Sequence, residues 1–112
     1  MTFPSRVKVG HVRYKMRNEK GLTSIAGASG TCGEDTQLIL VDDQLGPDQE
    51  RDTVLHEVLH AVFYAMNVKA VLPKDEAGDS KELEEKIIFA LATRLLELLR
   101  DNPKLVEYLT QA

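Results

Sequence analysis

Polar and apolar positions alternate near the start of the chain, which is typical of a half-buried β-strand. In residues 6–16 (RVKVGHVRYKM), charged side chains alternate with β-forming valine and tyrosine, and the slip at Gly10 predicts a β-bulge. A second β-run, TQLILVDD, covers residues 36–43. Between them, residues 19–36 contain four glycines and little periodicity. That segment predicts turns, with a short strand at LTSIAG.

Helical spacing replaces this alternation in the second half of the chain. After LGPDQ, apolar residues recur at helical spacing over 48–67, and Pro47 suits a first helical position. The apolar stripe consists of Val54, Leu55, Val58, Leu59, Val62, Phe63 and Met66. A second helix is predicted from 79 to the Asn-Pro pair at 102–103, and a short one over 104–110. Because residues 83–99 are apolar almost all round, we expect the second helix to be the most buried element.

The order of these elements predicts an α+β fold in one domain, residues 1–112. We expect a small antiparallel or mixed sheet, then two long packed helices and a short C-terminal helix. A lone cysteine, Cys32, and no signal-peptide pattern predict a cytoplasmic protein. No apolar tract is long enough for a membrane, and a net charge of −4 argues against a nucleic-acid partner. The pattern makes no prediction of oligomeric state.

The first predicted helix carries the sequence His56-Glu57-Val58-Leu59-His60. Histidines four apart on a helix lie on one face, where both imidazoles can bind one metal ion. Glu57, one position round the helix, can reach a metal-bound water without being a ligand. Roughly one shuffled chain in 150 would contain this motif by chance, so its context matters. Thr53 and Tyr64 share this face, which is poor in the Lys, Glu and Gln residues that are typical of a solvated surface. The alternative to a metal site is that the two histidines lie on an ordinary polar face.

A catalytic zinc site needs a third protein ligand and an open position for water. The candidates are Cys32, His11, Glu82, Glu84 and Glu85. The three acids open the second helix, where they could simply compensate the helix dipole. However, Glu84 and Glu85 share helix faces with apolar residues, and an unpaired inward carboxylate is costly. A metal ion would remove that cost. The helical spacing alone leaves both acids as candidates for the third ligand.

Together, TVLHEVLHAV and EEKIIFALATRLLELLRDNP resemble the small zincin-like proteins of phages and bacteria, related to the ImmA/IrrE-type metallopeptidases. The resemblance extends from the β-run at 37 to Pro103. It implies Glu85 as the third ligand, because EKIIFALATRLL matches the family pattern from that residue. Ile88 and Phe89 depart from the family's usual Ala-Asn, which keeps Glu84 as an alternative. The resemblance also implies a zincin-like minimal domain whose edge strand, here 37–41, lies beside the cleft, where an extended peptide could pair.

These observations predict zinc-dependent hydrolysis of a peptide bond in a protein or peptide substrate. Zn²⁺ would be held by His56, His60 and Glu85, with Glu57 as general base and acid. Tyr64 is a candidate oxyanion donor, and the simpler interpretation makes it a cleft wall.

Three alternatives remain. The chain could be a catalytically silent zincin-fold module that binds metal, or a metal-free interaction module. Cys32 could approach the metal as an inhibitory thiolate instead of being an ordinary loop thiol.

Overall fold

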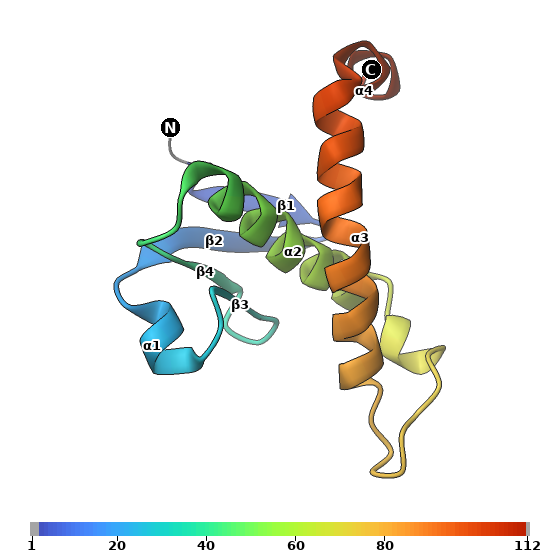
Figure 1. Cartoon of the computed structure of the whole chain (residues 1–112). Coiled ribbons are helices and arrows are strands. Elements are labelled where there is room, and N and C mark those ends of the chain that lie inside the picture. The colour runs from blue at the N-terminus through green and yellow to red at the C-terminus, as the bar shows by residue number, and fades with distance from the viewer. Residues whose placement is uncertain (1–2, 112) are drawn as a thin grey trace.

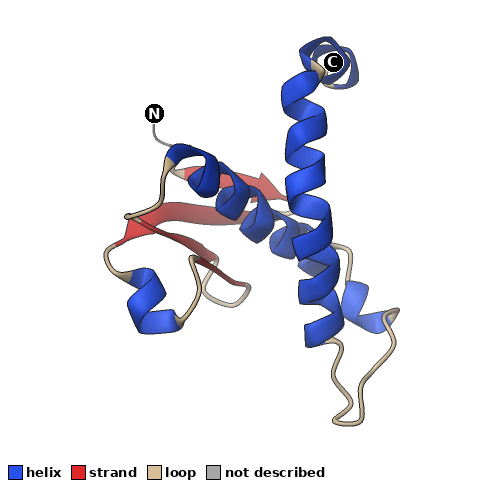
Figure 2. Cartoon of the chain, in the orientation of Figure 1, coloured by secondary structure: helices blue, strands red, loops and turns tan. Residues whose placement is uncertain are grey.

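The computed structural model describes residues 3–111, and it confirms the α+β class (Figures 1 and 2). Residues 1–2 and 112, the ends of the predicted domain, lie outside the described part. The elements in chain order are β1 (Arg6–Val9), β2 (Val12–Glu19), α1 (Leu22–Ala26), β3 (Gly30–Gly33), β4 (Leu38–Asp42), α2 (Pro47–Ala65), the 3-10 turn η1 (Val68–Ala70), α3 (Lys81–Asp101) and α4 (Pro103–Leu109). The three main predicted helices are therefore present with boundaries shifted by one or two residues.

The four strands form one mixed sheet in the order β1-β2-β4-β3. β2 pairs with β1 in antiparallel and with β4 in parallel orientation, and β3 adds antiparallel to β4. The expectation that residues 37–41 form the edge strand is therefore wrong. β4 is paired on both sides because β2 and β3 flank it, and its Ile39 and Val41 are fully buried, as suits an internal strand. The edge on that side of the sheet is β3.

Gly10 forms a hairpin turn and not the predicted bulge. Val9 pairs with Val12, so Gly10 and His11 are a two-residue connection between β1 and β2. Gly10 has φ +62°, a conformation that favours glycine in such turns. A β-carbon on Gly10 would lie 3.4 Å from that of Ala65, so this turn packs against the C-terminal end of α2.

LTSIAG, predicted as a strand, is instead the short helix α1. Its first turn is held by Asp42 at the end of β4, whose Oδ2 accepts hydrogen bonds from the Thr23 hydroxyl and from the Thr23 N–H, the latter at 3.0 Å. Asp42 Oδ1 also accepts the Gln44 N–H at 3.0 Å. These hydrogen bonds, led by that of the Thr23 hydroxyl, hold the pKa of Asp42 below its ordinary value. Asp42, which is distant in sequence, thus stabilises the first turn of α1, a helix that the spacing of apolar residues does not predict.

Helix α2 lies between the sheet and α3 (Figure 1). One side of α2 packs on the sheet core of Tyr14, Met16, Ile39 and Val41 through Val54, Val58, Ala61 and Val62. Its other side packs on Ile88, Ala92 and Leu95 of α3 through Leu55, Leu59 and Phe63. The two apolar stripes leave a third face, which directs His56, Glu57 and His60 of the HExxH motif toward β3 and the start of α3.

Helix α3 is not the most buried element, which corrects the expectation from its composition. Its buried residues are Glu84, Ile88 and Ala92, all on the side that faces α2. Phe89 is 75% exposed, and Leu91, Leu98 and Leu99 are also exposed. The reason is geometric: α3 crosses α2 and runs on past it, so that its C-terminal half and α4 project from the body (Figure 1). Within residues 3–111, no helix has the length and apolar character needed to cross a membrane.

Candidate metal centre

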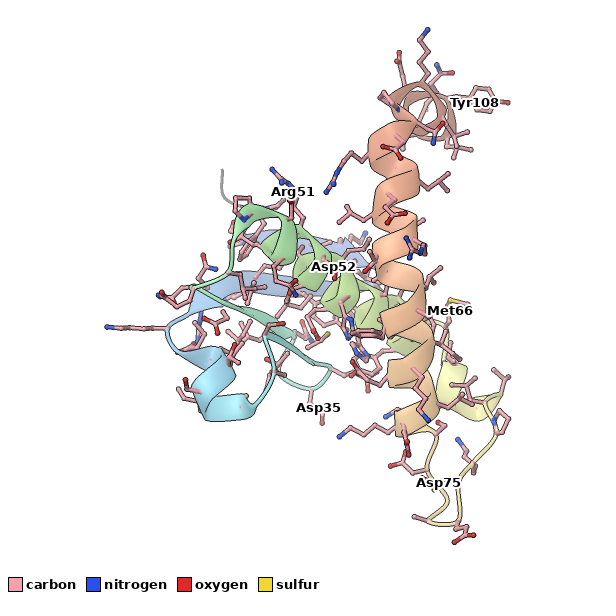
Figure 3. The ribbon with its side chains drawn as sticks, viewed as in Figure 1. Asp35, Arg51, Asp52, Met66, Asp75 and Tyr108 are labelled. Atoms are coloured by element: carbon pink, nitrogen blue, oxygen red, sulfur yellow. The ribbon has the colours of Figure 1, made fainter. Side chains whose placement is uncertain are left out.

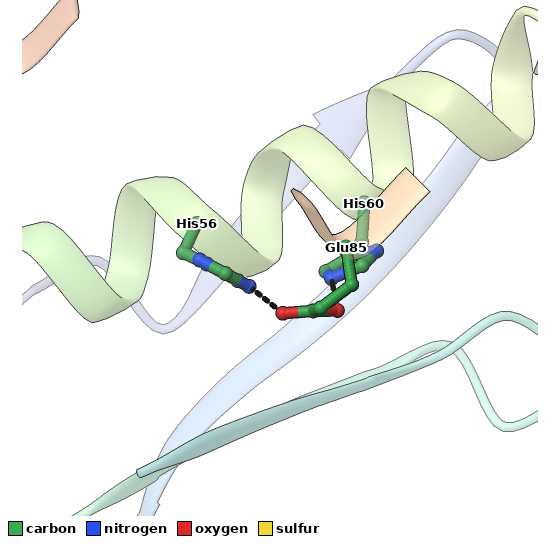
Figure 4. Close-up of side chains that lie close together, drawn as sticks. All are labelled: His56, His60 and Glu85. Carbon is green, nitrogen blue, oxygen red and sulfur yellow. Dashed lines mark hydrogen bonds and ion pairs between the residues drawn. The ribbon is translucent and has the colours of Figure 1, made fainter. Parts of the chain in front are cut away.

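His56 and His60 lie one turn apart on the third face of α2, with ring centroids 5.1 Å apart. Glu85, in the first turns of α3, faces both rings (Figure 4). Its Oε1 lies 2.6 Å from His56 Nε2, and its Oε2 lies 2.8 Å from His60 Nε2. The packing of α3 on α2 through Leu59 and Ile88 therefore brings together three side chains that come from two helices.

The chemistry of these three side chains fits a divalent transition metal. One ligand atom from each of His56, His60 and Glu85 lies within 4.8 Å of the others, so the group could hold a metal ion. Two imidazole nitrogens and one carboxylate oxygen are a ligand set found in catalytic zinc sites, where a fourth position stays open. Among the described residues, neither Cys32 nor His11 nor Glu82 belongs to the group. His11 is exposed in the β1–β2 turn, at the far end of α2 from Pro47.

Glu84 and its sequence neighbour Glu85 differ in how far their side chains are exposed. Its side chain is buried, 3% exposed, and its Oε1 lies 3.0 Å from His60 Nδ1. The Glu85 side chain is about half exposed, 54%, although it faces both rings. The expectation that both acids point inward thus holds for Glu84, while Glu85 sits at the rim, because the two positions lie about 100° apart round α3.

Both ring nitrogens of His60 consequently face a carboxylate oxygen: Nδ1 faces Glu84, and Nε2 faces Glu85. A neutral imidazole has one N–H, so it can donate to only one of the two. A cation shared by Nε2 and Glu85 would leave Nδ1–H to donate to Glu84. A carboxylate in that position fixes the ring orientation and tautomer of a metal-bound histidine.

Glu57 lies beside this group, buried against β3 with 6% of its surface exposed. Burial is the main reason that the pKa of its carboxyl rises to about 7; the charge of Glu85 raises it further and His60 opposes the shift. A β-carbon on Gly30 would lie 2.9 Å from Glu57 Cγ. The space for the Glu57 side chain therefore exists because position 30 has no side chain.

An open cleft of about 570 Å³ contains this site. Its floor is α2, one wall is the segment 28–32 that leads into and forms most of β3, and the other wall is the start of α3. The lining residues are Ala28, Ser29, Gly30, Thr31, Cys32, Gln49, Asp52, Thr53, His56, Glu57, His60, Tyr64, Lys81, Glu85 and Phe89. Asp52, labelled in Figure 3, accepts a hydrogen bond from Thr93 of α3 at 2.8 Å, which ties the two helices at one end of the cleft.

Tyr64 forms part of the cleft wall one turn after His60. The two rings stack with centroids 6.3 Å apart, and the Tyr64 hydroxyl donates to the Cys32 carbonyl at 3.5 Å. Burial is the main reason that the pKa of Tyr64 rises to about 12, and the nearby acidic groups of Cys32, Glu84, Glu34 and Glu57 raise it further when they are ionised. Its hydroxyl is therefore a proton-bearing hydrogen-bond donor at neutral pH.

Cys32 lines the same wall from β3, partly buried. Burial first, and then the nearby Glu57, Glu34 and Glu84 carboxylates, raises the pKa of its thiol to about 12. A thiol in such surroundings keeps its proton at neutral pH and is a poor nucleophile. In the metal-free protein these surroundings disfavour the thiolate, whereas a bound metal ion would favour it, so the inhibitory role of Cys32 stays a prediction.

Sequence reasoning did not find the contribution of β3 to the cleft. Gly30 makes room for Glu57, and Ser29 Oγ lies 3.2 Å from Thr53 Oγ1, so the start of β3 is fastened to α2 beside the site. The segment SGTCG has no alternating β-pattern that would have predicted a strand. The one available signal was the run of small residues, which permits close approach of a backbone to a helix.

Comparison of the chain with protein-family models, with curated proteins and with solved structures finds no match. The function is therefore inferred from the chemistry of the cleft.

Proposed function

We propose that the protein is a zinc-dependent peptidase of the HExxH type, similar to the zincin-like, ImmA/IrrE-related enzymes. The observation that carries the proposal is the position of Glu85, whose two oxygens face the Nε2 atoms of His56 and His60 across the gap between α2 and α3. The buried carboxyl of Glu57 stands next to this group. The combination supports a metal site with an adjacent acid–base residue.

In this proposal His56, His60 and Glu85 hold the ion, and Glu84 orients His60 through Nδ1. Zinc is the metal of choice for two histidines and one glutamate. When bound, it supplies Lewis-acid chemistry that polarises a carbonyl group and acidifies water.

Glu57 is the proposed general base and acid. Its carboxyl would accept a proton from the attacking water and return it to the leaving amine when the peptide bond breaks. Burial raises the pKa of this carboxyl to about 7 in the metal-free protein, and a neighbouring cation would lower that pKa and so favour the carboxylate that accepts the proton. Tyr64, whose hydroxyl keeps its proton, would exchange its hydrogen bond to the Cys32 carbonyl for one to an oxygen that gains negative charge.

The shape of the cleft favours an extended peptide as the substrate. Among the described strands, β3 pairs only with β4, so its outer edge has no strand partner beside the site, and the Tyr64 hydroxyl contacts one carbonyl of that edge, that of Cys32. An extended peptide can add to such an edge as a further strand. Phe89, one turn after Glu85 and largely exposed, offers apolar contact to a substrate side chain.

Metal analysis and a peptide-library assay on the full chain test the proposal. Protein purified without chelator is expected to contain about one zinc per chain. A mixture of quenched fluorescent peptides is expected to be cleaved by the wild type and left intact by Glu57→Gln, which should keep its zinc and fold. Absence of a stoichiometric transition metal after zinc is offered would overturn the metal site. Zinc binding without cleavage by the wild type would leave a metal-binding module and overturn the hydrolase, and equal cleavage by wild type and Glu57→Gln would overturn the role of Glu57.

A further inference from the structure

Helix α4 exposes three large apolar side chains on one face. Leu105 is 40% exposed, Leu109 64% and Tyr108 71%. Figure 3 shows Tyr108 at the projecting end of the chain, directed away from the body. The helix has seven residues, none of them buried, and so short a helix is unstable without packing partners. Residues 105, 108 and 109 have the i, i+3, i+4 spacing of a helix that docks into a groove. We call α4 with these three residues the arm.

A separate apolar groove of about 510 Å³ lies between the first half of α2 and the last third of α3. It shares no lining residue with the metal cleft. The apolar lining consists of Phe3, Leu45, Pro47, Val54, Leu55, Val58, Leu96 and Leu99, with Glu50 and Arg51 also at its surface. Within residues 3–111 the groove is not filled, although its walls are continuous with the core.

We propose that the arm of each molecule docks into the groove of a second copy, so that the protein is a symmetric dimer. The two surfaces lie at the same end of the molecule, because Leu99 in the groove wall is on the helix that leads directly into the arm. A two-fold axis near that end therefore allows both arms to dock at once, which closes the assembly at two copies. This inference is independent of the metal site.

The charges of this region fit an identical partner. Residues 91–111 carry three positive and three negative side chains, Arg94, Arg100 and Lys104 against Glu97, Asp101 and Glu107, while the whole chain has a net charge of −4. Two copies would otherwise repel each other, but residues 91–111, which form the arm and one wall of the groove, add no net charge to the contact. A nucleic acid or a strongly charged protein would instead require an excess of one sign.

The apolar area is also sufficient. The exposed parts of Leu105, Tyr108 and Leu109 amount to on the order of 400 Å² per arm, since a fully exposed aromatic side chain presents about 150–250 Å². Two dockings that also cover the smaller surface of the groove would bury on the order of 1,200 Å² in total, the lower end of the range for a standard stable interface.

Sedimentation velocity of the full chain between about 1 and 100 μM tests the dimer, a range in which micromolar affinity becomes visible. The wild type is expected to be dimeric. The arm variant Tyr108→Glu/Leu109→Lys and the groove variant Leu99→Glu are expected to be monomeric, with affinity at least about 100-fold weaker, because central apolar anchors dominate such interfaces. The controls Ile25→Lys and Val71→Glu alter apolar residues elsewhere that are more exposed than those of the arm and the groove, and these variants should stay dimeric.

A monomeric wild type at the highest concentration would overturn the proposal, as would a dimer that persists in the arm variant. Equal dissociation of Ile25→Lys would show nonspecific apolar association and would overturn it too. Circular dichroism establishes that each variant is folded. If the arm double variant were unfolded, Tyr108→Ala, which only truncates an exposed side chain, would decide in its place by the same criteria.

Discussion

Gly30 of β3 lies directly against Glu57 of α2. A β-carbon at position 30 would lie 2.9 Å from Cγ and 3.0 Å from Oε2 of Glu57, and 2.6 Å from Cγ2 of Thr53. Distances this short cannot persist, so a larger residue at position 30 would have to displace the Glu57 side chain. The edge strand of the sheet thereby sets the position of the proposed general base.

Gly30→Ala is therefore expected to reduce hydrolysis while zinc stays bound. A displacement of Glu57 by about 1 Å could lower kcat/KM on the order of 100-fold, and overpacking should destabilise the fold by about 1–3 kcal/mol. Peptide cleavage, zinc content and urea unfolding measure the three effects. Gly46→Ala is the control, because a β-carbon there meets no atom within 4 Å. Full activity of Gly30→Ala would contradict the placement of Glu57.

The two neighbouring acids should differ in their effect on metal affinity. Glu85→Gln removes a proposed ligand charge and is expected to abolish stoichiometric zinc binding, as His56→Ala should. Glu84→Gln keeps an oxygen that can accept from His60 Nδ1, and we expect a loss of about 10-fold, at the lower end for a residue that supports a ligand.

Competition titration with a zinc chelator gives both affinities. Glu82→Gln, an exposed acid in the same turn of α3 that pairs with Lys86, is the matched control and should bind zinc like the wild type. The assignment is wrong if Glu84→Gln loses zinc completely while Glu85→Gln retains it.

The stability of the metal-free protein should depend on the ionisation of Glu57. Because its folded-state pKa is raised from 4.5 to about 7, the unfolded chain loses this proton first, and stability falls as the pH rises from 4.5 through 7. In chelator, Glu57→Gln should match the wild type near pH 4.5 and exceed it above pH 8, by on the order of 3 kcal/mol.

Denaturant unfolding at several pH values measures this difference. The control Glu97→Gln removes an exposed acid that pairs with Arg94 at the surface of α3, and it measures the contribution of an ordinary surface ion pair to the pH profile. A constant difference between Glu57→Gln and wild type across the range would show that burial does not perturb the Glu57 carboxyl.

The elements with clear local periodicity were predictable from the sequence. The apolar stripe of α2 and the proline at position 47 predicted the position and the start of that helix. The Asn102-Pro103 pair predicted the end of α3. The burial of α3 was overestimated, because an apolar composition shows which side chains could be buried. It does not show whether another element packs against them. The tertiary crossing of α2 and α3 decides that, and it covers only one side of α3.

The elements that depend on distant contacts were not predictable. α1 begins where Asp42 of β4 accepts the Thr23 N–H, and β3 forms because β4 offers a free edge to a segment of small residues. The spacing of apolar residues also could not predict the order of the strands in the sheet. For that reason β4 was expected at the edge of the sheet and not in its interior.

The candidate site was predictable in part for the same reason. His56, Glu57 and His60 lie on one helix, and their spacing alone places them on one surface. The choice between Glu84 and Glu85 depends on how α3 is rotated against α2, which the residues in contact with Ile88 determine. Gly30, which makes room for the Glu57 side chain, lies in β3, a strand that the sequence pattern does not predict.

The contact between His56 and Glu85 joins positions 29 residues apart in the chain. An ion held there as proposed would act as a reversible cross-link that closes a long loop and is lost when the metal is withdrawn. Because α3 contacts the rest of the molecule mainly through α2, withdrawal would loosen α3 and α4 together. Zinc supply would then govern not only turnover of substrate but also how long each molecule survives proteolysis in the cell.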